Sequence, residues 1–167
     1  MTDLRTAYER IDRSLTGWMA ANGVRLLRIS LGVVFLWFGF LKFFPGLSPA
    51  QSLAGETMAL LSFGLLSPQT AVAILAVWEC LIGLGLITGR FLRATLLLLW
   101  LQMVGTVTPL VLFPDLCFTV PPIAPTLEGQ YIIKNLVLIT AGIVIGATVR
   151  GGRLSAQPAP DGADGPG

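Results

Sequence analysis

The 167-residue chain is 54% hydrophobic and only 12% charged, whereas soluble domains carry roughly a quarter charged residues. This composition excludes an ordinary soluble domain. It also excludes disorder over most of the length, because so apolar a chain can bury ample surface. The absence of histidine removes the commonest zinc ligand and the usual general base. We therefore expect a small integral membrane protein.

The charged residues and cysteines exclude further classes. The net charge of +2 does not indicate a nucleic-acid partner, because the eleven basic residues are scattered at segment ends and form no patch. The two cysteines, Cys80 and Cys117, are too few for a disulfide framework and lack the spacing of metal ligands. We expect membrane lipid as the surroundings, with no nucleic acid and no metal site.

Four windows are long and apolar enough to cross a hydrocarbon core, which is about 30 Å thick and needs ~20 helical residues. They cover residues 26–44, 69–89, 94–113 and 131–149. The third window contains Pro109 in its last turns, where a kink is tolerated in lipid. The short connections predict an all-α fold, an antiparallel four-helix transmembrane bundle over residues 24–149.

The arginines predict the orientation of this bundle. All of them flank the same side of the spans: Arg5, Arg10, Arg13, Arg25, Arg28, Arg90, Arg93, Arg150 and Arg153. The opposite side holds Lys42 and Lys134. The positive-inside rule then places both termini in the cytoplasm, with residues 46–67 and 114–128 outside. A cleavable signal peptide is the competing interpretation of the first span, but acidic residues precede it and a proline interrupts the nearest small-residue cleavage site.

Residues 1–22 have the pattern of an amphipathic helix. Apolar residues recur at alternating spacings of four and three, and charged residues occupy the other face. The apolar members are Leu4, Tyr8, Ile11, Leu15 and Trp18. We expect this helix on the cytoplasmic leaflet. A coiled coil with a partner chain is the alternative, for which five anchors are few.

Three further segments flank the spans. The run Ser48-Pro49-Ala50-Gln51 supplies an N-cap, a proline at the first helical position and a capping-box glutamine, and predicts a short helix at the outer surface. Residues 114–128 are too apolar for a solvated loop and too proline-rich for a helix, so we expect them to cover the outer end of the bundle. Residues 150–167 are expected to form a disordered cytoplasmic tail.

Glycines are spaced so that helices can approach closely in lipid. They are Gly85 and Gly89 in the second span, Gly142 and Gly146 in the fourth, and Gly32 and Gly39 in the first. Small residues at such spacings form helix interfaces in membranes. We expect these glycines to pack the spans together, and the GxxxG faces also offer an interface for an oligomer.

Glu79 lies at the centre of the second span, where a carboxylate costs at least ~2.5 kcal/mol even on the lenient insertion scale. It must therefore be neutral or have a partner. The candidate cations are Lys42, Lys134 and Arg28, and spacing along the helices does not choose among them. The alternative that needs no ligand is a protonated Glu79 that only hydrogen-bonds a neighbouring helix, with tryptophans that only fill space. Lys42 and Lys134 are then snorkelling anchors rather than ligands.

Further polar and aromatic residues predict a cavity in the outer half of the bundle. Gln102 is central in the third span, and Trp37, Trp78 and Trp100 lie near the middle of their spans although tryptophan prefers the interface. Glu79 is the candidate catalytic group, as a proton acceptor. The candidate ligand-binding residues are Lys42, Lys134, Asn135, Arg28, Gln102, Trp78, Glu128 and Gln130.

Several motifs resemble those of the DoxX family, the DoxX and DoxD-like four-helix inner-membrane proteins of bacteria. They are Arg28-Ile29-Ser30-Leu31-Gly32, Gly39-Phe40-Leu41-Lys42-Phe43, Glu79 with Gly83, Leu86 and Gly89-Arg90, Thr108-Pro109-Leu110, and the stretch from Glu128-Gly129 to Lys134-Asn135. The resemblance covers roughly residues 24–149. Within the family, the sequence closely resembles the branch that includes a membrane protein of reactive-chlorine resistance.

The resemblance implies an inner-membrane protein linked to redox or oxidative-stress functions. One relative, DoxD, is a subunit of a thiosulfate:quinone oxidoreductase, and others associate with soluble thiol or superoxide-handling enzymes. The first hypothesis is thus a membrane subunit that binds a quinone-like apolar ligand. Because the sequence has no haem, flavin or iron-sulfur motif, the electrons would be carried by a partner, such as a soluble oxidoreductase or thiol enzyme, or by the quinone itself. A small-solute transport component and a structural anchor for a soluble partner are the alternatives, and whether the chain is an enzyme stays open.

Overall fold

Helix α1 (Thr2–Leu41) runs without a break from the amphipathic segment into the first span. The computed structural model describes residues 2–48 and 51–156 of the chain. The boundary that we expected at residues 22–24, between an amphipathic helix and the bundle, lies inside α1 and is not the end of a helix. Pro49 and Ala50 of the predicted capping motif, and residues 157–167 of the predicted tail, lie outside the described residues.

The predicted outer helix and the other three spans are present, and short elements that were not predicted lie between α4 and α7. The elements after α1 are α2 (Gln51–Leu61), α3 (Pro68–Thr88), α4 (Leu92–Val107), α5 (Pro109–Leu112), α6 (Pro114–Cys117), β1 (Phe118–Val120), β2 (Ala124–Pro125) and α7 (Leu127–Ala147). Four stretches have the length and composition of membrane spans: Leu4–Leu41, Pro68–Thr88, Leu92–Leu112 and Leu127–Ala147. The all-α membrane bundle is confirmed, and the protein is a multi-pass membrane protein.

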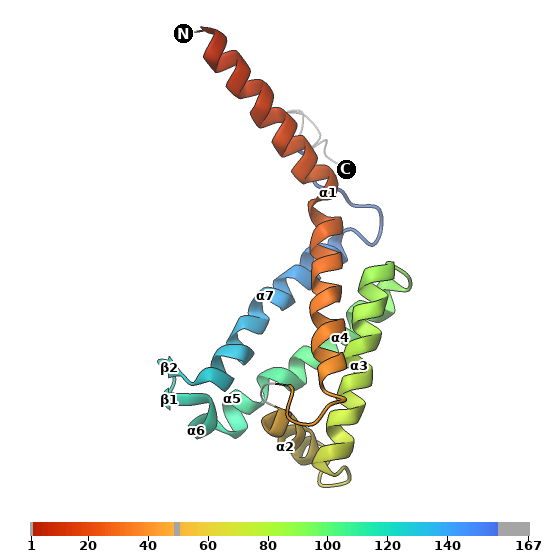
Figure 1. The fold of residues 1–167 in the computed structure, drawn as a ribbon, viewed down its shortest axis with the longest axis vertical. Coiled ribbons are helices and arrows are strands. Elements are labelled where there is room, and N and C mark those ends of the chain that lie inside the picture. Colours follow the sequence, from red (N-terminus) through yellow and green to blue (C-terminus); the bar gives the residue numbers. More distant parts are fainter. Residues whose placement is uncertain (1, 49–50, 157–167) are drawn as a thin grey trace, which may run out of the picture.

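The four spanning helices form a closed ring of contacts, in which α1 packs on α3, α3 on α4, α4 on α7, and α7 on α1. The start of α1 and the end of α7 lie at one end of the bundle, which also carries the arginines and is called the arginine end below (Figure 1). Helices α2, α5 and α6 and the small hairpin lie at the other end, called the α2 end.

Local chemistry explains where the helices begin and end. Ser67 caps α3, because its side-chain oxygen accepts a hydrogen bond from the Thr70 N–H, and Pro68 occupies the first turn. Gly89 ends the same helix in the left-handed conformation, with φ 70°, and its N–H donates to the Gly85 carbonyl. Pro109 divides the third span, since α4 ends at Val107 and α5 begins at the proline.

Glycines bring α1 and α3 into close contact, as expected for Gly32 and Gly39. A Cβ on Gly32 would lie 2.9 Å from the Gly83 carbonyl oxygen, and one on Gly83 would lie 2.6 Å from the Leu36 nitrogen. Any larger side chain at these positions would push the two helices apart. Gly142 and Gly146 lie against Leu99 and Leu96 of α4 in the same chain.

Residues 114–128 differ from the expectation of an irregular cover. Pro114 opens the one-turn helix α6, where its missing N–H leaves no intrahelical bond unmade. Strands β1 and β2 then pair antiparallel in a two-stranded hairpin. The Thr126 N–H donates to the Cys117 carbonyl at 2.9 Å and joins this segment to the start of α7. The expectation that the prolines forbid helix here was wrong for its first turn.

Two apolar cores hold the bundle. The larger core runs through the middle and toward the arginine end, and its buried members are Leu31, Phe35, Ile82, Leu86, Leu96, Leu99, Met103, Ala141 and Ile145. The smaller core at the α2 end joins Leu53 of α2 to Cys117 and to Ile132 of α7. The smaller core fixes α2 against the bundle, and α2 contributes residues to the candidate site described below.

Candidate functional site

Glu79 is buried in α3 with only 8% of its surface exposed, and it has two polar partners. The Lys42 Nζ lies 2.6 Å from its Oε2, in an ion pair whose two side chains are each about 10% exposed. The Gln102 Nε2 donates to its Oε1 at 2.7 Å. Both carboxylate oxygens are therefore hydrogen-bonded, as a buried charge requires. Of the three candidate cations, Lys42 is the one that pairs with Glu79.

The close approach of α1 and α3 makes this pair possible. Gly39 lies three residues before Lys42, and a Cβ on Gly39 would lie 2.8 Å from the Glu79 Cβ. Because the backbones meet here, the lysine just after the end of α1 can reach back along the bundle to a carboxylate in the middle of α3. The Lys42 ammonium also lies 3.5 Å from the Phe38 carbonyl in the last turn of α1. Gln102 reaches Glu79 from α4, on the opposite side.

The ion pair borders a cavity of about 430 Å³ toward the α2 end. Its walls come from α1, α2, α3, α4 and α7 and are mostly apolar, with side chains such as Phe35, Leu53 and Met103. The polar residues that line it are Lys42, Ser48, Thr57, Glu79, Gln102, Thr106, Tyr131, Lys134 and Asn135. A cavity of this size, apolar with a few converging polar groups, has the character of a small-molecule site.

Lys134 provides a second ammonium group at this cavity. It does not pair with Glu79, and its Nζ lies 5.8 Å from the centre of the Tyr131 ring. The Lys134 side chain is exposed and the neighbouring Asn135 is half-buried. The cavity thus has a neutralised ion pair on one wall and a cation with an amide on the wall formed by α7.

Gln102 carries the unsatisfied polar atom of the site. Its Nε2 donates to Glu79, but its Oε1 is buried without a hydrogen-bond partner, and it is the one such side-chain atom among the described residues. An unpaired buried carbonyl oxygen costs about 1–3 kcal/mol. An incoming O–H or N–H group, or a protonated Glu79 after rotation of the amide, would satisfy it.

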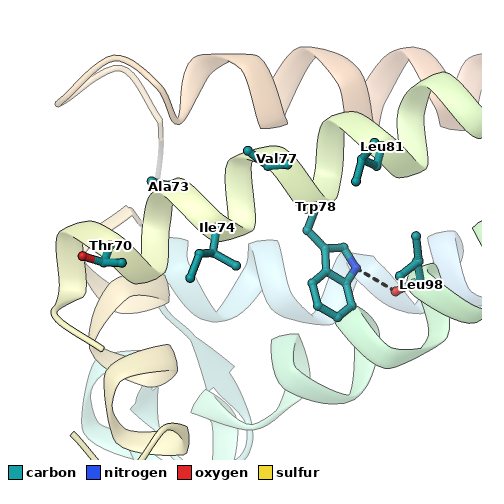
Figure 2. Close-up of a pocket in the computed structure, with 7 residues that line it drawn as sticks. All are labelled: Thr70, Ala73, Ile74, Val77, Trp78, Leu81 and Leu98. Atoms are coloured by element: carbon teal, nitrogen blue, oxygen red, sulfur yellow. Dashed lines mark hydrogen bonds between the residues drawn. The ribbon is translucent and has the colours of Figure 1, made fainter. Parts of the chain in front are cut away.

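Trp78 lines both this cavity and a second, apolar depression. Figure 2 shows the residues of the depression. The depression, of about 410 Å³, lies on α3 and α4 and is lined by Thr70, Ala73, Ile74, Val77, Trp78, Leu81 and Leu98. Figure 2 shows the Trp78 indole reaching toward α4, where its Nε1 donates to the Leu98 carbonyl at 3.0 Å. The lining of this depression contains no ionisable side chain, so we assign the candidate site to the cavity that contains Glu79.

The structure places several expected site residues elsewhere. Arg28 is at the arginine end, where its guanidinium occupies the space of a Cβ on Gly89 at the end of α3. A cation is favourable there, because helix carbonyls point out of that terminus. Glu128 and Gln130 are exposed in the first turns of α7 and do not line the cavity.

The aromatic wall is also smaller than expected. Trp78 lines the cavity, but Trp37 is 65% exposed on the outer side of α1. Trp100 packs against the larger core. The expectation that all three tryptophans surround one cavity was therefore wrong, because their positions along the spans do not decide which way each helix faces.

The contribution of α2, and of Ser48 in the segment before it, to the cavity was not predicted from the sequence. Ser48 and Thr57 line the cavity, and Thr57 is buried with its hydroxyl donating to the Leu53 carbonyl at 2.6 Å. Leu53 and Thr57 are four residues apart on one helix face, which is the signal that could have indicated a buried side of α2. In the described part of the chain, no group of three or more Cys, Asp or Glu side chains could hold a metal ion.

Comparison with known protein families identifies the DoxX family. Its model matches residues 23–114, which include Lys42, Glu79 and Gln102. No curated protein and no solved structure matches the chain.

Proposed function

The chain belongs to the DoxX family, and on that premise we propose that it binds a quinone, or a lipid-soluble compound of similar chemistry, in the cavity beside Glu79. In this proposal the protein is a membrane subunit of a redox system linked to oxidative stress. A soluble oxidoreductase or thiol enzyme is its electron-transfer partner.

The buried ion pair beside the cavity is the observation that carries the proposal. Lys42 and Glu79 could have been replaced by a packed apolar pair at little or no cost in stability, since buried ion pairs rarely stabilise a fold. Ionisable groups inside a membrane span instead tend to mark sites of binding or proton movement. Here the pair borders 430 Å³ of cavity on spanning helices, within reach of a ligand dissolved in the bilayer.

The residues present fit the chemistry of such a ligand. Apolar walls suit a ring and its substituents, and the Lys134 ammonium and Asn135 amide can donate hydrogen bonds to ring oxygens. Gln102 has the opposite preference, because its unpartnered Oε1 needs a donor. The site can therefore accept a ligand in a reduced state that carries a hydroxyl group as well as in an oxidised state that carries carbonyl oxygens.

Glu79 is proposed as the proton acceptor. A quinone supplies two-electron redox chemistry coupled to two protons when it is bound. Glu79 can take one proton from a ligand hydroxyl, and Lys42 holds the carboxylate ionised until then by its direct ion pair. Gln102 can follow the change, since an amide can donate to a carboxylate and accept from a protonated carboxyl group after it rotates.

Placement in the bacterial inner membrane, with both termini in the cytoplasm, completes the proposal. All nine arginines flank the same side of the predicted spans. The start of α1 and the end of α7 lie at that end of the bundle in Figure 1. The positive-inside rule makes this the cytoplasmic side. The cavity then lies in the outer half of the bilayer.

Quinone retained from native membranes tests the proposal. We would purify the wild type and an Ala54→Phe variant, whose ring fills the cavity from α2, and measure bound quinone by mass spectrometry. Ala73→Phe is the matched control, because it places the same ring in the lipid-facing depression on α3. Thermal unfolding of each variant shows whether the bundle is intact.

The expected result is stoichiometric quinone in the wild type and in Ala73→Phe, with a loss of at least tenfold in Ala54→Phe. Equal retention in all three proteins would show that the quinone is bound as bulk lipid. Absence of quinone from the folded wild type, both as purified and after reconstitution with added quinone, would remove the proposed ligand.

A further inference from the structure

The first half of α1 carries an apolar stripe that none of the residues described by the structure covers. Its members are 53% to 80% exposed: Leu4, Tyr8, Ile11, Leu15 and Trp18. The opposite face is charged and internally paired, with Glu9 bonded to Arg5 at 3.2 Å and near Arg13 at 4.0 Å. The first member of α1 that packs against the larger core is Leu27, so the stripe lies wholly beyond the bundle.

The stripe lies on the same side of the helix as the lipid-facing residues of the span. At ~100° per residue, the stripe falls within one arc of the helix surface together with the exposed residues Leu26, Val33, Trp37 and Phe40. The face that contacts α3, marked by Gly32 and Gly39, is about 100° away around the axis. A bend of α1 toward its lipid-facing side would therefore turn the stripe down onto the bilayer beside the bundle.

Two glycines weaken the helix at the place where such a bend is needed. Gly17 and Gly23 lie in the helix interior, and a Cβ on either would meet nothing within 4 Å. Neither glycine is required by packing, in contrast to Gly32 and Gly39. Each glycine lowers the equilibrium constant for forming the helix at its position about fivefold relative to alanine. The pair Asn22-Gly23 also has the composition of a helix end.

The structure already shows a change of direction in this region. In Figure 1 the first half of α1 leaves the bundle at an angle to the second half and leans away from α3. The Asn22 side chain donates to the Trp18 carbonyl at 3.0 Å, a bond that satisfies this carbonyl when the helix opens. Helix bends commonly occur at such glycine positions.

We propose that α1 has a hinge at Gly17–Gly23 and that the stripe docks on the lipid surface of the membrane that the bundle spans. The partner is the headgroup and upper acyl region of the leaflet at the arginine end. Tyr8 and Trp18 have the side chains that favour this depth, and the paired Arg5, Glu9 and Arg13 stay in water on the other face. We assign the lipid as the occupant for two reasons. The stripe is covalently joined to a helix that spans the bilayer, and it lies on the same side of that helix as the lipid-facing residues of the span.

Spin-label accessibility of the whole protein in vesicles of phosphatidylethanolamine and phosphatidylglycerol tests this. Labels at Ile11→Cys on the stripe and at Arg13→Cys on the charged face are compared in a Cys80→Ala, Cys117→Ala background. We expect oxygen, which concentrates in lipid, to relax the Ile11 label more, and a water-soluble nickel chelate to relax the Arg13 label more. Quenching of Trp18 by brominated lipid, taken as the difference between wild type and Trp18→Phe, repeats the test without cysteines.

Two results would overturn lipid docking. Equal access of the nickel chelate to both labels would place the stripe in water. Exclusion of both reagents from the Ile11 label, together with spin-spin broadening between molecules, would mean that a second copy covers the stripe.

The hinge is tested separately with Gly17→Ala and Gly23→Ala combined. This variant should shift the equilibrium between the bent and the straight form of α1 toward the straight form by tenfold or more. The oxygen accessibility of the Ile11 label should fall as a result. Gly105→Ala is the matched control, since Gly105 is a helical glycine with nothing within 4 Å of its Cβ position. An unchanged oxygen accessibility in the double variant would overturn the hinge.

Discussion

The Lys42 ammonium lies 2.6 Å from the Glu79 carboxylate, although the two residues are 37 positions apart in the chain. The pair joins the end of α1 to the middle of α3 through a glycine contact at Gly39. This relationship links the fold to the proposed chemistry, since the same contact packs the bundle and places the proposed proton acceptor beside the cavity.

Removal of one partner of this pair should be costly. Lys42→Met leaves the Glu79 carboxylate buried without its cation, and we expect a loss of about 3–5 kcal/mol in the free energy of unfolding. The double variant Lys42→Met, Glu79→Gln removes the charge and should regain most of that loss. Thermal unfolding in detergent, with the Glu79→Gln single variant completing the cycle, measures the coupling. Additive losses would mean that the two groups do not interact.

Close packing of α1 on α3 predicts a second effect on stability. Gly83→Ala would place a Cβ 2.6 Å from the Leu36 nitrogen, so the two helices must separate. We expect a loss of about 1–3 kcal/mol. A Cβ on Gly105 of α4 would meet nothing within 4 Å, so Gly105→Ala should be neutral or stabilising by up to about 1 kcal/mol. Equal unfolding temperatures for the two variants would contradict the observed glycine contact.

Part of this fold could be predicted from the sequence, because a membrane span needs only length and apolar composition. The four spans and the α2 helix follow from such local signals. The partner of Glu79 could not be chosen, since Lys42, Lys134 and Arg28 all lie within reach by their depth alone. The choice depends on which helix faces touch, and that is set by the contact at Gly39.

The cavity was predictable in its polar groups but not in its shape. Gln102 and Asn135 were found because polar residues are rare within spans. Trp37 was misplaced, since its depth says nothing about its side of the helix. Thr57 was missed because its four-residue spacing from Leu53 indicates a buried face of α2 but not that this face borders the cavity.

Cys117 should be inert in the folded protein. The side chain is fully buried, and its Sγ lies 3.5 Å from the Pro109 carbonyl. Burial, with a smaller contribution from the Glu128 carboxylate, raises the pKa of the Cys117 thiol, so little thiolate exists at neutral pH. In a Cys80→Ala variant we expect no maleimide labelling until the protein is unfolded. Rapid labelling of the native protein at pH 7 would contradict this burial.

The same thiol gives a stability change at alkaline pH. Because the pKa of Cys117 is higher in the folded state than in the unfolded chain, the unfolded state loses its proton first as the pH rises. The free energy of unfolding should then fall as the pH rises past the ordinary thiol pKa, about 8.5. Cys117→Ala should remove this component, as measured by unfolding temperatures across the alkaline range.

The arrangement of arginines predicts the topology. In a Cys80→Ala, Cys117→Ala background, a membrane-impermeant maleimide added to whole cells should label Ser52→Cys in α2 and should leave Ser155→Cys unlabelled. Ser155→Cys should react once the cells are permeabilised. Labelling of Ser155→Cys in intact cells would place the arginine end outside and reverse the proposed orientation.

Proton transfer to Glu79 can be observed directly by redox-induced infrared difference spectroscopy on the protein reconstituted with quinone. Oxidation of bound quinol should produce a protonated-carboxyl band in the wild type. The band should be absent in Glu79→Gln and present in the control Glu56→Gln, whose side chain is exposed on α2. A band that persists in Glu79→Gln with quinone bound, or no band in the quinone-loaded wild type, would contradict the role of Glu79 as proton acceptor.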